Sequence, residues 1–182
     1  MKIFLSLLVL LMSHSAFATD NPTVIMDTSK GQITLELFPN EAPKTVANFL
    51  AYIEKDGYKQ TTFHRVINGF MIQGGGFLAE TGKRADTFPS IENESKNGLS
   101  NNRGTISMAR TNAPHSASRQ FFINHKDNAF LDANGNNWGY AVFGRVTDGM
   151  SIVDSIANVK TAAADKPVQN VIINNIKLLE KK

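Results

Sequence analysis

The sequence contains no cysteine. That absence excludes disulfide frameworks, zinc sites with thiolate ligands and cysteine nucleophiles. An excess of one charge is also missing: 19 Lys and Arg face 16 Asp and Glu, and the basic residues are scattered along the chain. A groove that binds nucleic acid usually carries a basic stripe, so we expect no nucleic-acid partner.

No hydrophobic run reaches the length of a membrane-spanning helix. Residues 3–12 are apolar except for Ser6, whereas a spanning helix needs about 20 apolar residues. Lys2 precedes this run and Ala16-Phe17-Ala18 follows it, a pattern typical of a cleavable secretory signal peptide. We therefore expect residues 1–18 to be a signal peptide and residues 19–182 to be the exported domain, without stable membrane insertion after cleavage. The expected location is the periplasm, with secretion as the alternative.

The remaining residues alternate between short β-like runs and two helical patterns. The chain has 182 residues, which predicts one domain. Apolar spacing predicts an amphipathic helix that begins near Pro43 and ends before Gly57, and a second helix over residues 150–158 with Asp148 as its N-cap. Strands are expected at residues 24–28, 33–37, 63–67, 70–73, 105–109, 121–124, 141–146 and 171–179, and a long loop at residues 74–102. Short antiparallel strands at this density predict a barrel or sandwich with helices over its ends.

The familiar metal and catalytic motifs are absent. Gly74-Gly75-Gly76 followed by Gly82-Lys83 lacks the spacing of a phosphate-binding loop. Residues 132–136 resemble the start of a calcium loop but lack its later glycine and glutamate. We therefore predict no metal site and no cofactor. The usual acid, base and nucleophile sets are missing too, so an enzyme with this sequence would use chemistry that needs no proton relay.

One extended run is far more specific. The segment Phe63-His64-Arg65-Val66-Ile67-Asn68-Gly69-Phe70-Met71-Ile72-Gln73-Gly74-Gly75 resembles the signature of the cyclophilin-type peptidyl-prolyl isomerases. Further matches follow in family order at residues 107–109, 118–123, 130–132 and 142–144. The resemblance spans residues 23–179 and implies a mainly β fold: an eight-stranded antiparallel barrel closed by two α-helices, with substrate in a groove on the outer wall. The sequence is most similar in character to the periplasmic bacterial members.

The resemblance also assigns roles to individual residues. Arg65 corresponds to the family's catalytic arginine. Four apolar residues correspond to the walls of the proline pocket: Phe70, Met71, Phe122 and Leu131. Four others correspond to residues that bind the peptide, by side chain or along a backbone edge: Gln73, Gln120, Ala109 and Arg110. The implied partner is a proline-containing polypeptide, and the implied state is a monomer.

Three positions depart from the family pattern. Many relatives have Asn where this chain has Arg110, Trp where it has Phe130, and His where it has Tyr140. Phe130 and Tyr140 still belong to the expected substrate-binding set. In relatives with Trp, the indole N–H donates a hydrogen bond to the macrocyclic inhibitor cyclosporin, and a phenylalanine has no such donor. We therefore expect weak cyclosporin binding.

The chemistry of the X-Pro bond suits these residues. Rotation must overcome a barrier of about 18–20 kcal/mol because the amide loses resonance as it twists. A catalyst therefore has to hold the ring, hold the flanking backbone and donate hydrogen bonds to the twisted amide. Arg65 carries fixed donors and a permanent charge. A barrier lowered by about 7 kcal/mol would correspond to roughly 10⁵-fold acceleration.

Simple strand alternation adds one further expectation. It places His64 on the face opposite Arg65, where it would serve a structural role. Without the family resemblance, composition alone would predict that the apolar residues of the site belong to the core. It would also predict that Arg65 is a solvated surface residue.

Two other functions remain open from the residues. A non-catalytic peptide-binding or chaperone module could use the same barrel, but it would not require the donor at Arg65. A hollow, lipocalin-like barrel for small ligands would need small inward residues, whereas Phe, Ile and Leu are frequent at the inward positions. The leading prediction is therefore a prolyl isomerase that assists the folding of exported polypeptides.

Overall fold

The computed structural model describes residues 21–179, so the expected signal peptide lies outside the described residues. These residues form, in chain order, β1 (Thr23–Thr28), β2 (Gly31–Leu37), α1 (Pro43–Glu54), β3 (Thr61–Ile67), β4 (Met71–Leu78), β5 (Thr105–Met108), β6 (Phe121–Asn124), the short helix η1 (Ala129–Leu131), β7 (Val142–Asp148), α2 (Met150–Ala157), the short helix η2 (Ala163–Asp165) and β8 (Val171–Leu178).

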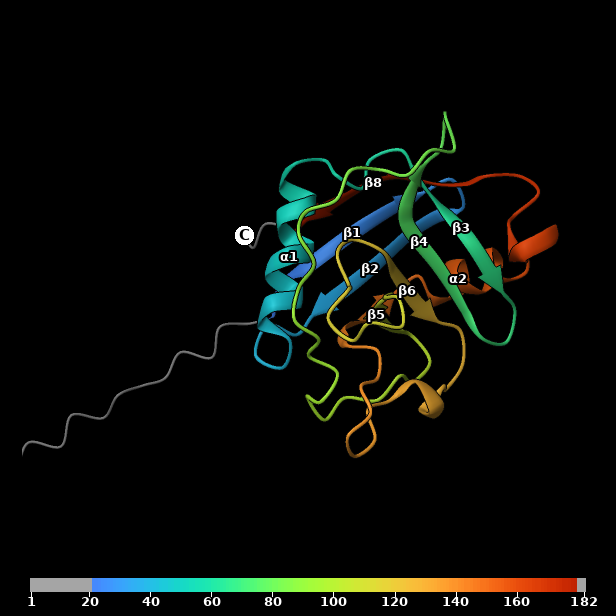
Figure 1. Cartoon of the computed structure of the whole chain (residues 1–182). Coiled ribbons are helices and arrows are strands. Elements are labelled where there is room, and N and C mark those ends of the chain that lie inside the picture. Colours follow the sequence, from blue (N-terminus) through green and yellow to red (C-terminus); the bar gives the residue numbers. More distant parts are fainter. Residues whose placement is uncertain (1–20, 180–182) are drawn as a thin grey trace, which may run out of the picture.

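The strands close into an antiparallel barrel. Its order is β1-β2-β7-β5-β6-β4-β3-β8, and β8 returns to pair with β1. Helix α1 packs against β8, and α2 packs against β2, β3 and β4, on different sides of the barrel (Figure 1). The predicted eight-stranded barrel with two helices is confirmed.

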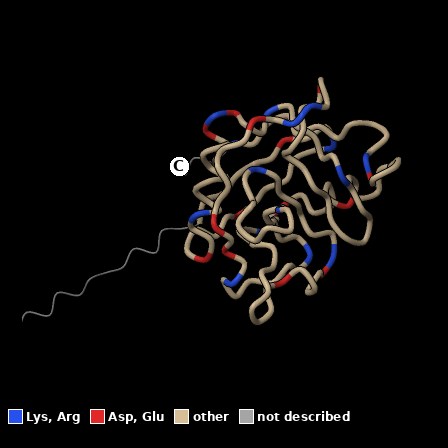
Figure 2. The backbone as a smooth tube through the Cα atoms, in the orientation of Figure 1, with Lys and Arg blue, Asp and Glu red and all other residues tan. Residues whose placement is uncertain are grey.

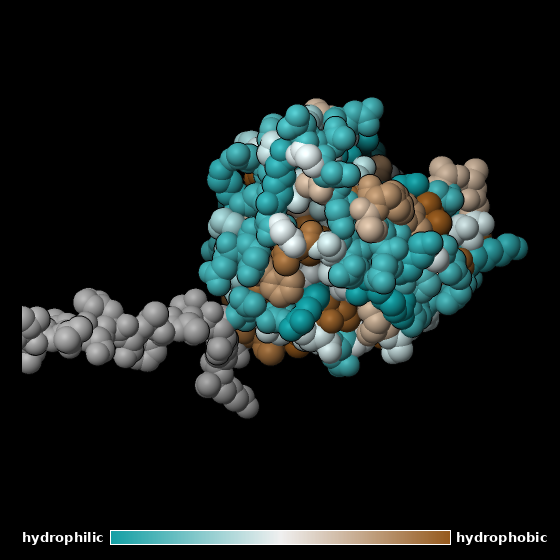
Figure 3. All heavy atoms as spheres, turned by 90° about the horizontal axis from the view of Figure 1, so that it is seen from below, coloured by the Kyte–Doolittle hydropathy of each residue, from teal (hydrophilic) through white to brown (hydrophobic). Residues whose placement is uncertain are grey.

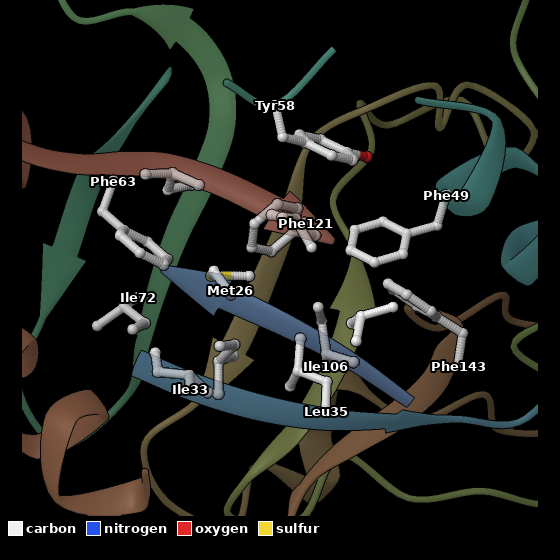
Figure 4. Packing of buried hydrophobic residues seen from close by; sticks show 14 of the residues in the cluster. Met26, Ile33, Leu35, Phe49, Tyr58, Phe63, Ile72, Ile106, Phe121 and Phe143 are labelled. Carbon is white, nitrogen blue, oxygen red and sulfur yellow. The ribbon is translucent and has the colours of Figure 1, made fainter. Parts of the chain in front are cut away.

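Large apolar side chains fill the barrel interior. Ile33, Leu35 and Leu37 alternate with polar residues along β2, and all three are fully buried. Figure 4 shows residues from opposite walls meeting Phe49 of α1, whose ring lies 5.8 Å from that of Phe121. Because the interior is packed with side chains, it offers no central cavity of the lipocalin kind.

Strand β4 is longer than the sequence pattern predicts. The expected loop at residues 74–102 begins only after Leu78, because Gly74-Gly75-Gly76 continue the strand. Gly75 has φ +80°, and a Cβ there would lie 2.9 Å from the rings of Phe121 and Tyr58. A Cβ on Gly76 would lie 2.5 Å from the Gln120 side chain. The glycines therefore permit side chains to approach the strand closely.

The start of α2 also differs from expectation. Asp148 is the last residue of β7 and pairs with Thr34, so it is not the N-cap. Gly149 takes that position with φ +85°, a left-handed conformation that glycine adopts without steric cost. A Cβ on Gly149 would lie 2.3 Å from the carbonyl oxygen of Gln32, which explains why the turn needs a glycine.

The charged side chains follow no single stripe. Figure 2 shows Lys and Arg interspersed with Asp and Glu along the described backbone. On the face shown in Figure 3, hydrophilic residues predominate and hydrophobic ones form small separate patches. Within residues 21–179, no helix is long and apolar enough to span a membrane.

Candidate active site

Three neighbouring strands form the base of the predicted site on the outer wall of the barrel. Arg65 on β3 pairs with Gln73 on β4, and Gln73 pairs with Phe122 on β6. Beside this row lies a cavity of about 320 Å³. Nine of the predicted residues line it: Arg65, Phe70, Met71, Gln73, Ala109, Arg110, Phe122, Leu131 and Tyr140.

The apolar lining is separate from the barrel core. Met71, Phe122 and Leu131 are buried in a small cluster of their own, against which Phe70 and Tyr140 pack. Residues 71 and 73 of β4 point outward, whereas Ile72 between them belongs to the core. These residues therefore form an apolar floor for the surface cavity.

A β-bulge determines where Arg65 points. The β3–β4 register shifts between Phe63 and Arg65, while Phe63 and Val66 both remain in the core. His64 and Arg65 consequently both lie on the outer side and line one cavity there. The expectation that His64 lies opposite Arg65 is wrong, because simple alternation does not hold across a bulge.

The Arg65 guanidinium retains free donors. Its Nε donates to Asp165 Oδ2 at 3.4 Å, and the side chain is 44% exposed. Its two terminal nitrogens make no hydrogen bond with any other residue among 21–179. The four N–H groups that they carry are thus available to a ligand in the neighbouring cavity.

Gln120 lies beside the cavity rather than in it. Its Oε1 accepts a hydrogen bond from Gln73 Nε2 at 2.9 Å, so one carboxamide orients the other. Gln120 lines an adjacent cavity of about 220 Å³, which also touches Gln73, Ala109 and Arg110. The two glutamines and the edge at residues 109–110 therefore form the boundary between two adjoining hollows.

Two of the departures from the family pattern contact each other. The Arg110 guanidinium lies over the Tyr140 ring, 4.7 Å from its centroid. Arg110 also donates to the carbonyl of Gly139 at 3.0 Å and to that of Trp138 at 2.8 Å. The stacking and the hydrogen bonds fix both side chains, so this pair forms one rigid wall of the cavity.

Phe130 does not line the cavity. It is 72% exposed, and its ring stacks on that of Phe70 with centroids 5.6 Å apart. The only tryptophan, Trp138, packs its ring against His115 at 5.0 Å and beneath Lys96 Nζ at 4.5 Å. Neither of these neighbours lines the cavity of the predicted site.

A buried polar network behind the site did not emerge from the sequence. Asn128 Nδ2 donates to the Phe70 carbonyl at 2.9 Å and to Asn124 Oδ1 at 2.8 Å. Asn124 Nδ2 donates to Asn101 Oδ1 at 3.2 Å, and Asn101 Nδ2 donates to Asp132 Oδ1 at 2.8 Å. The network ties β6 and η1 to the turn that carries Phe70. The many Asn residues between 97 and 137 were its only sequence signal. Within the described chain, no cluster of three His, Cys, Asp or Glu side chains could hold a metal ion.

Comparisons with known proteins agree with this geometry. The family model described as cyclophilin type peptidyl-prolyl cis-trans isomerase/CLD matches residues 23–178. A peptidyl-prolyl cis-trans isomerase of Streptomyces antibioticus is 55% identical over an alignment of 164 residues, and the match covers 86% of this chain and 98% of the relative. Isomerase B of Escherichia coli K12 is 49% identical, covering 86% and 99%. Isomerase A of Dickeya dadantii is 46% identical, covering 99% of both chains.

A solved structure has the same fold. The cyclophilin-type isomerase of Cryptosporidium parvum, determined in the presence of the dipeptide Ala-Pro, superposes with a TM-score of 0.77 and 32% identity. The match covers 87% of this chain and 99% of that protein.

Proposed function

The chain belongs to the cyclophilin-type peptidyl-prolyl cis-trans isomerases, and we propose that Arg65 and the cavity beside it form the active site, acting on exported polypeptides. The observation that carries this assignment is the position of Arg65. Its terminal nitrogens make no hydrogen bond within residues 21–179, and they stand at the edge of a cavity with an apolar floor.

Each part of the site supplies one requirement of the reaction. The floor of Met71, Phe122 and Leu131 would hold the pyrrolidine ring away from water. Gln73, oriented by Gln120, would bind the flanking backbone. Arg65 would donate to the prolyl carbonyl and to the nitrogen lone pair that appears as the amide twists. Donors that fit the twisted amide better than the planar one lower the barrier.

The direct test is exchange NMR on a short peptide with a single Ala-Pro bond. Catalysis is expected to broaden the cis and trans signals of the peptide and to produce exchange cross-peaks between them. Both effects should occur at substoichiometric protein concentrations. A non-catalytic binding module would instead shift the signals of the bound peptide while leaving the interconversion rate unchanged.

Export is the second part of the proposal. The family match begins at residue 23, so the apolar segment at residues 3–12 lies outside the isomerase domain. With Lys2 before it and Ala16-Phe17-Ala18 after it, the segment has the order of a signal peptide.

We predict a mature N-terminus at Thr19 and release of the protein into the periplasm. Mass spectrometry of the protein from an osmotic-shock fraction measures that terminus. Replacing Ala18 by a bulky residue should block cleavage there and serves as the control. Protein that retains Met1 in a soluble cytoplasmic pool would contradict the prediction.

Inhibition by cyclosporin should be weak because Phe130 offers a ring without a donor. A missing neutral hydrogen bond costs about 0.5–1.5 kcal/mol, and a buried carbonyl left without a partner about 1–3 kcal/mol. The first cost corresponds to affinity that is weaker by roughly 2- to 12-fold, and the second to affinity that is weaker by roughly 5- to 150-fold. Phe130→Trp should restore much of it, because position 130 stands at the open edge beside Phe70.

The matched control is Trp138→Phe. Its ring packs on His115 and Lys96, so its removal should leave cyclosporin inhibition unchanged. Peptide isomerisation at increasing drug concentration gives the inhibition constant for all three proteins. Nanomolar inhibition of the wild type that disappears in Trp138→Phe would show that Trp138 supplies the donor instead.

A further inference from the structure

A second, larger cavity lies on the other side of Arg65. Its volume is about 530 Å³, against about 320 Å³ for the cavity assigned to proline, and Arg65 lines both. It is a half-open cavity between the end of β4, with the turn after it, and the tip of the hairpin at residues 160–170. In Figure 1 this hairpin, in orange to red, lies beside β3, which η2 contacts.

Apolar side chains line one part of this cavity, and polar side chains line the rest. Leu78, 36% exposed, lines it together with Phe77 and the methyl groups of Ala163 and Ala164. The His64 ring packs edge-on against Phe77 at 4.6 Å. Burial lowers the pKa of His64, so its imidazole is neutral at pH 7. Its Nδ1 is buried and has no hydrogen-bond partner among residues 21–179.

The hairpin wall is held in place before any ligand arrives. Ala162 N donates to the Lys166 carbonyl at 2.8 Å, and Val168 N donates to that of Lys160 at 2.9 Å. At the tip, Ala164 and Asp165 both have left-handed backbone angles, with φ of 60° and 59°. This conformation is costly for residues with a side chain, and such strain is retained where surrounding contacts enforce it. The Asp165–Arg65 ion pair is one of those contacts.

We infer that this cavity binds a large apolar side chain, aromatic or branched aliphatic, of the same polypeptide whose X-Pro bond lies at Arg65. The occupant follows from continuity: a chain that leaves the proline cavity past Arg65 meets the second cavity directly. Three charged side chains line it: Glu80 and Lys166 carry opposite charges, and Arg65 is paired with Asp165, which gives no preference for a charged side chain. The inference rests on the proposed function and adds a sequence preference to it.

The test is a set of peptides with one Ala-Pro bond in an otherwise Ala and Ser background. A single Phe is moved through every position from four residues before the proline to four residues after it, omitting the neighbours of the proline. The wild type is expected to show kcat/KM about tenfold higher for one or two adjacent positions than for the peptide without Phe, mainly through a lower KM. Amide NMR signals of residues 78–82 and 163–166 should shift with that peptide only.

Two variants and a control locate the effect. Leu78→Asp makes the cavity polar, and Ala163→Phe fills it, so either should bring the ratio between the Phe peptide and the plain peptide close to one. Val168 is on the same hairpin, is exposed and does not line this cavity. Val168→Asp should therefore keep the tenfold ratio. Since a ratio is measured in each protein, a change in overall activity does not obscure the result.

The outcomes separate this inference from the proposed function. If the wild type isomerises the plain peptide and depends on Arg65, but shows no preference for Phe at any position, the second cavity is not a subsite. If Phe raises kcat/KM equally in Ala163→Phe and the wild type, the ring binds elsewhere and the inference is also wrong. Loss of Arg65 dependence would instead overturn the assigned active site.

Discussion

Arg65→Ala is expected to lower kcat/KM for X-Pro isomerisation by at least tenfold, about 1.4 kcal/mol of transition-state stabilisation. The loss should fall mainly on kcat, because the ring and backbone contacts of the peptide remain while the donors to the twisted amide are gone. Exchange NMR on an Ala-Pro peptide, with both proteins at equal concentration, measures the difference.

The variant should remain folded. Arg65 forms one ion pair of 3.4 Å with Asp165, and both side chains are nearly half exposed, an arrangement worth less than about 1 kcal/mol. Circular dichroism and thermal unfolding check this point.

Two further arginine variants test the mechanism. Arg65→Lys keeps the charge but loses the planar fork of donors, so it should remain well below the wild type. Arg145→Ala is the matched control, because this exposed arginine pairs with Glu36 away from the cavity. A folded Arg65→Ala protein with near wild-type turnover would overturn the assigned role of Arg65.

Much of the fold could be predicted from the hydrophobic periodicity of the sequence, because burial of one face of a strand or helix enforces that periodicity. Ile33, Leu35 and Leu37 alternate along β2 since one face of that strand is the core. Val46, Phe49 and Ile53 recur at helical spacing since α1 covers the barrel on one side only. The order of strands around the barrel was not readable in this way, because it depends on pairings between distant segments. The family resemblance supplied the closed eight-stranded barrel, and the structure supplies the order of its strands.

Two of the wrong predictions share a physical cause. A bulge adds a residue that alternation cannot count, so alternation predicts the wrong side for His64. Glycine is usually a turn signal, yet Gly74-Gly75-Gly76 continue β4 because large side chains need the space that a Cβ would occupy. Both errors occur where backbone geometry responds to packing that involves residues far away in the sequence.

The candidate site, too, could be predicted only in part from the sequence. The residues that the resemblance supplied lie in one cavity, apart from Gln120 beside it and the outward Phe130. Asp165 was not anticipated, since 100 positions separate it from Arg65 and its left-handed backbone has no signature in the sequence. The coupling of Arg110 to Tyr140 was also hidden. The sequence shows them as two separate departures from the family pattern, whereas in the structure one stacks on the other.

The largest stability effect is expected at Arg119, which is 3% exposed and has no salt-bridge partner among the described residues. Its Nε donates to the Gly75 carbonyl at 2.6 Å, and its terminal nitrogens donate to the carbonyls of Asp86 and Gly57. One side chain therefore joins the turn after α1, strand β4 and the long loop that follows it. Burial lowers the pKa of Arg119, yet a guanidinium stays protonated at neutral pH.

Arg119→Met should lower the free energy of unfolding by about 3–5 kcal/mol, because three carbonyls lose their donors and each unsatisfied group costs about 1–3 kcal/mol before water relieves part of it. The substitution also removes the contacts of the guanidinium with the rings of Tyr52 and Tyr58. The centroids of these rings lie 5.0 and 5.5 Å from Arg119 Cζ. The free energy of unfolding of Arg119→Lys should lie between those of the wild type and Arg119→Met, since one ammonium cannot reach three separate carbonyls in a plane. Urea unfolding followed by circular dichroism gives the free energies.

Arg145→Ala is again the control, with an expected loss below about 1 kcal/mol for an exposed pair. The region that is destabilised distinguishes the loss of the three Arg119 hydrogen bonds from a general loss of packing. If Arg119 holds the long loop, hydrogen exchange in Arg119→Met should accelerate most at residues 79–104, and less in β1 and β2, which make none of its bonds. Stability equal to that of Arg145→Ala, or exchange that rises uniformly over the barrel, would show that the three carbonyls do not depend on Arg119.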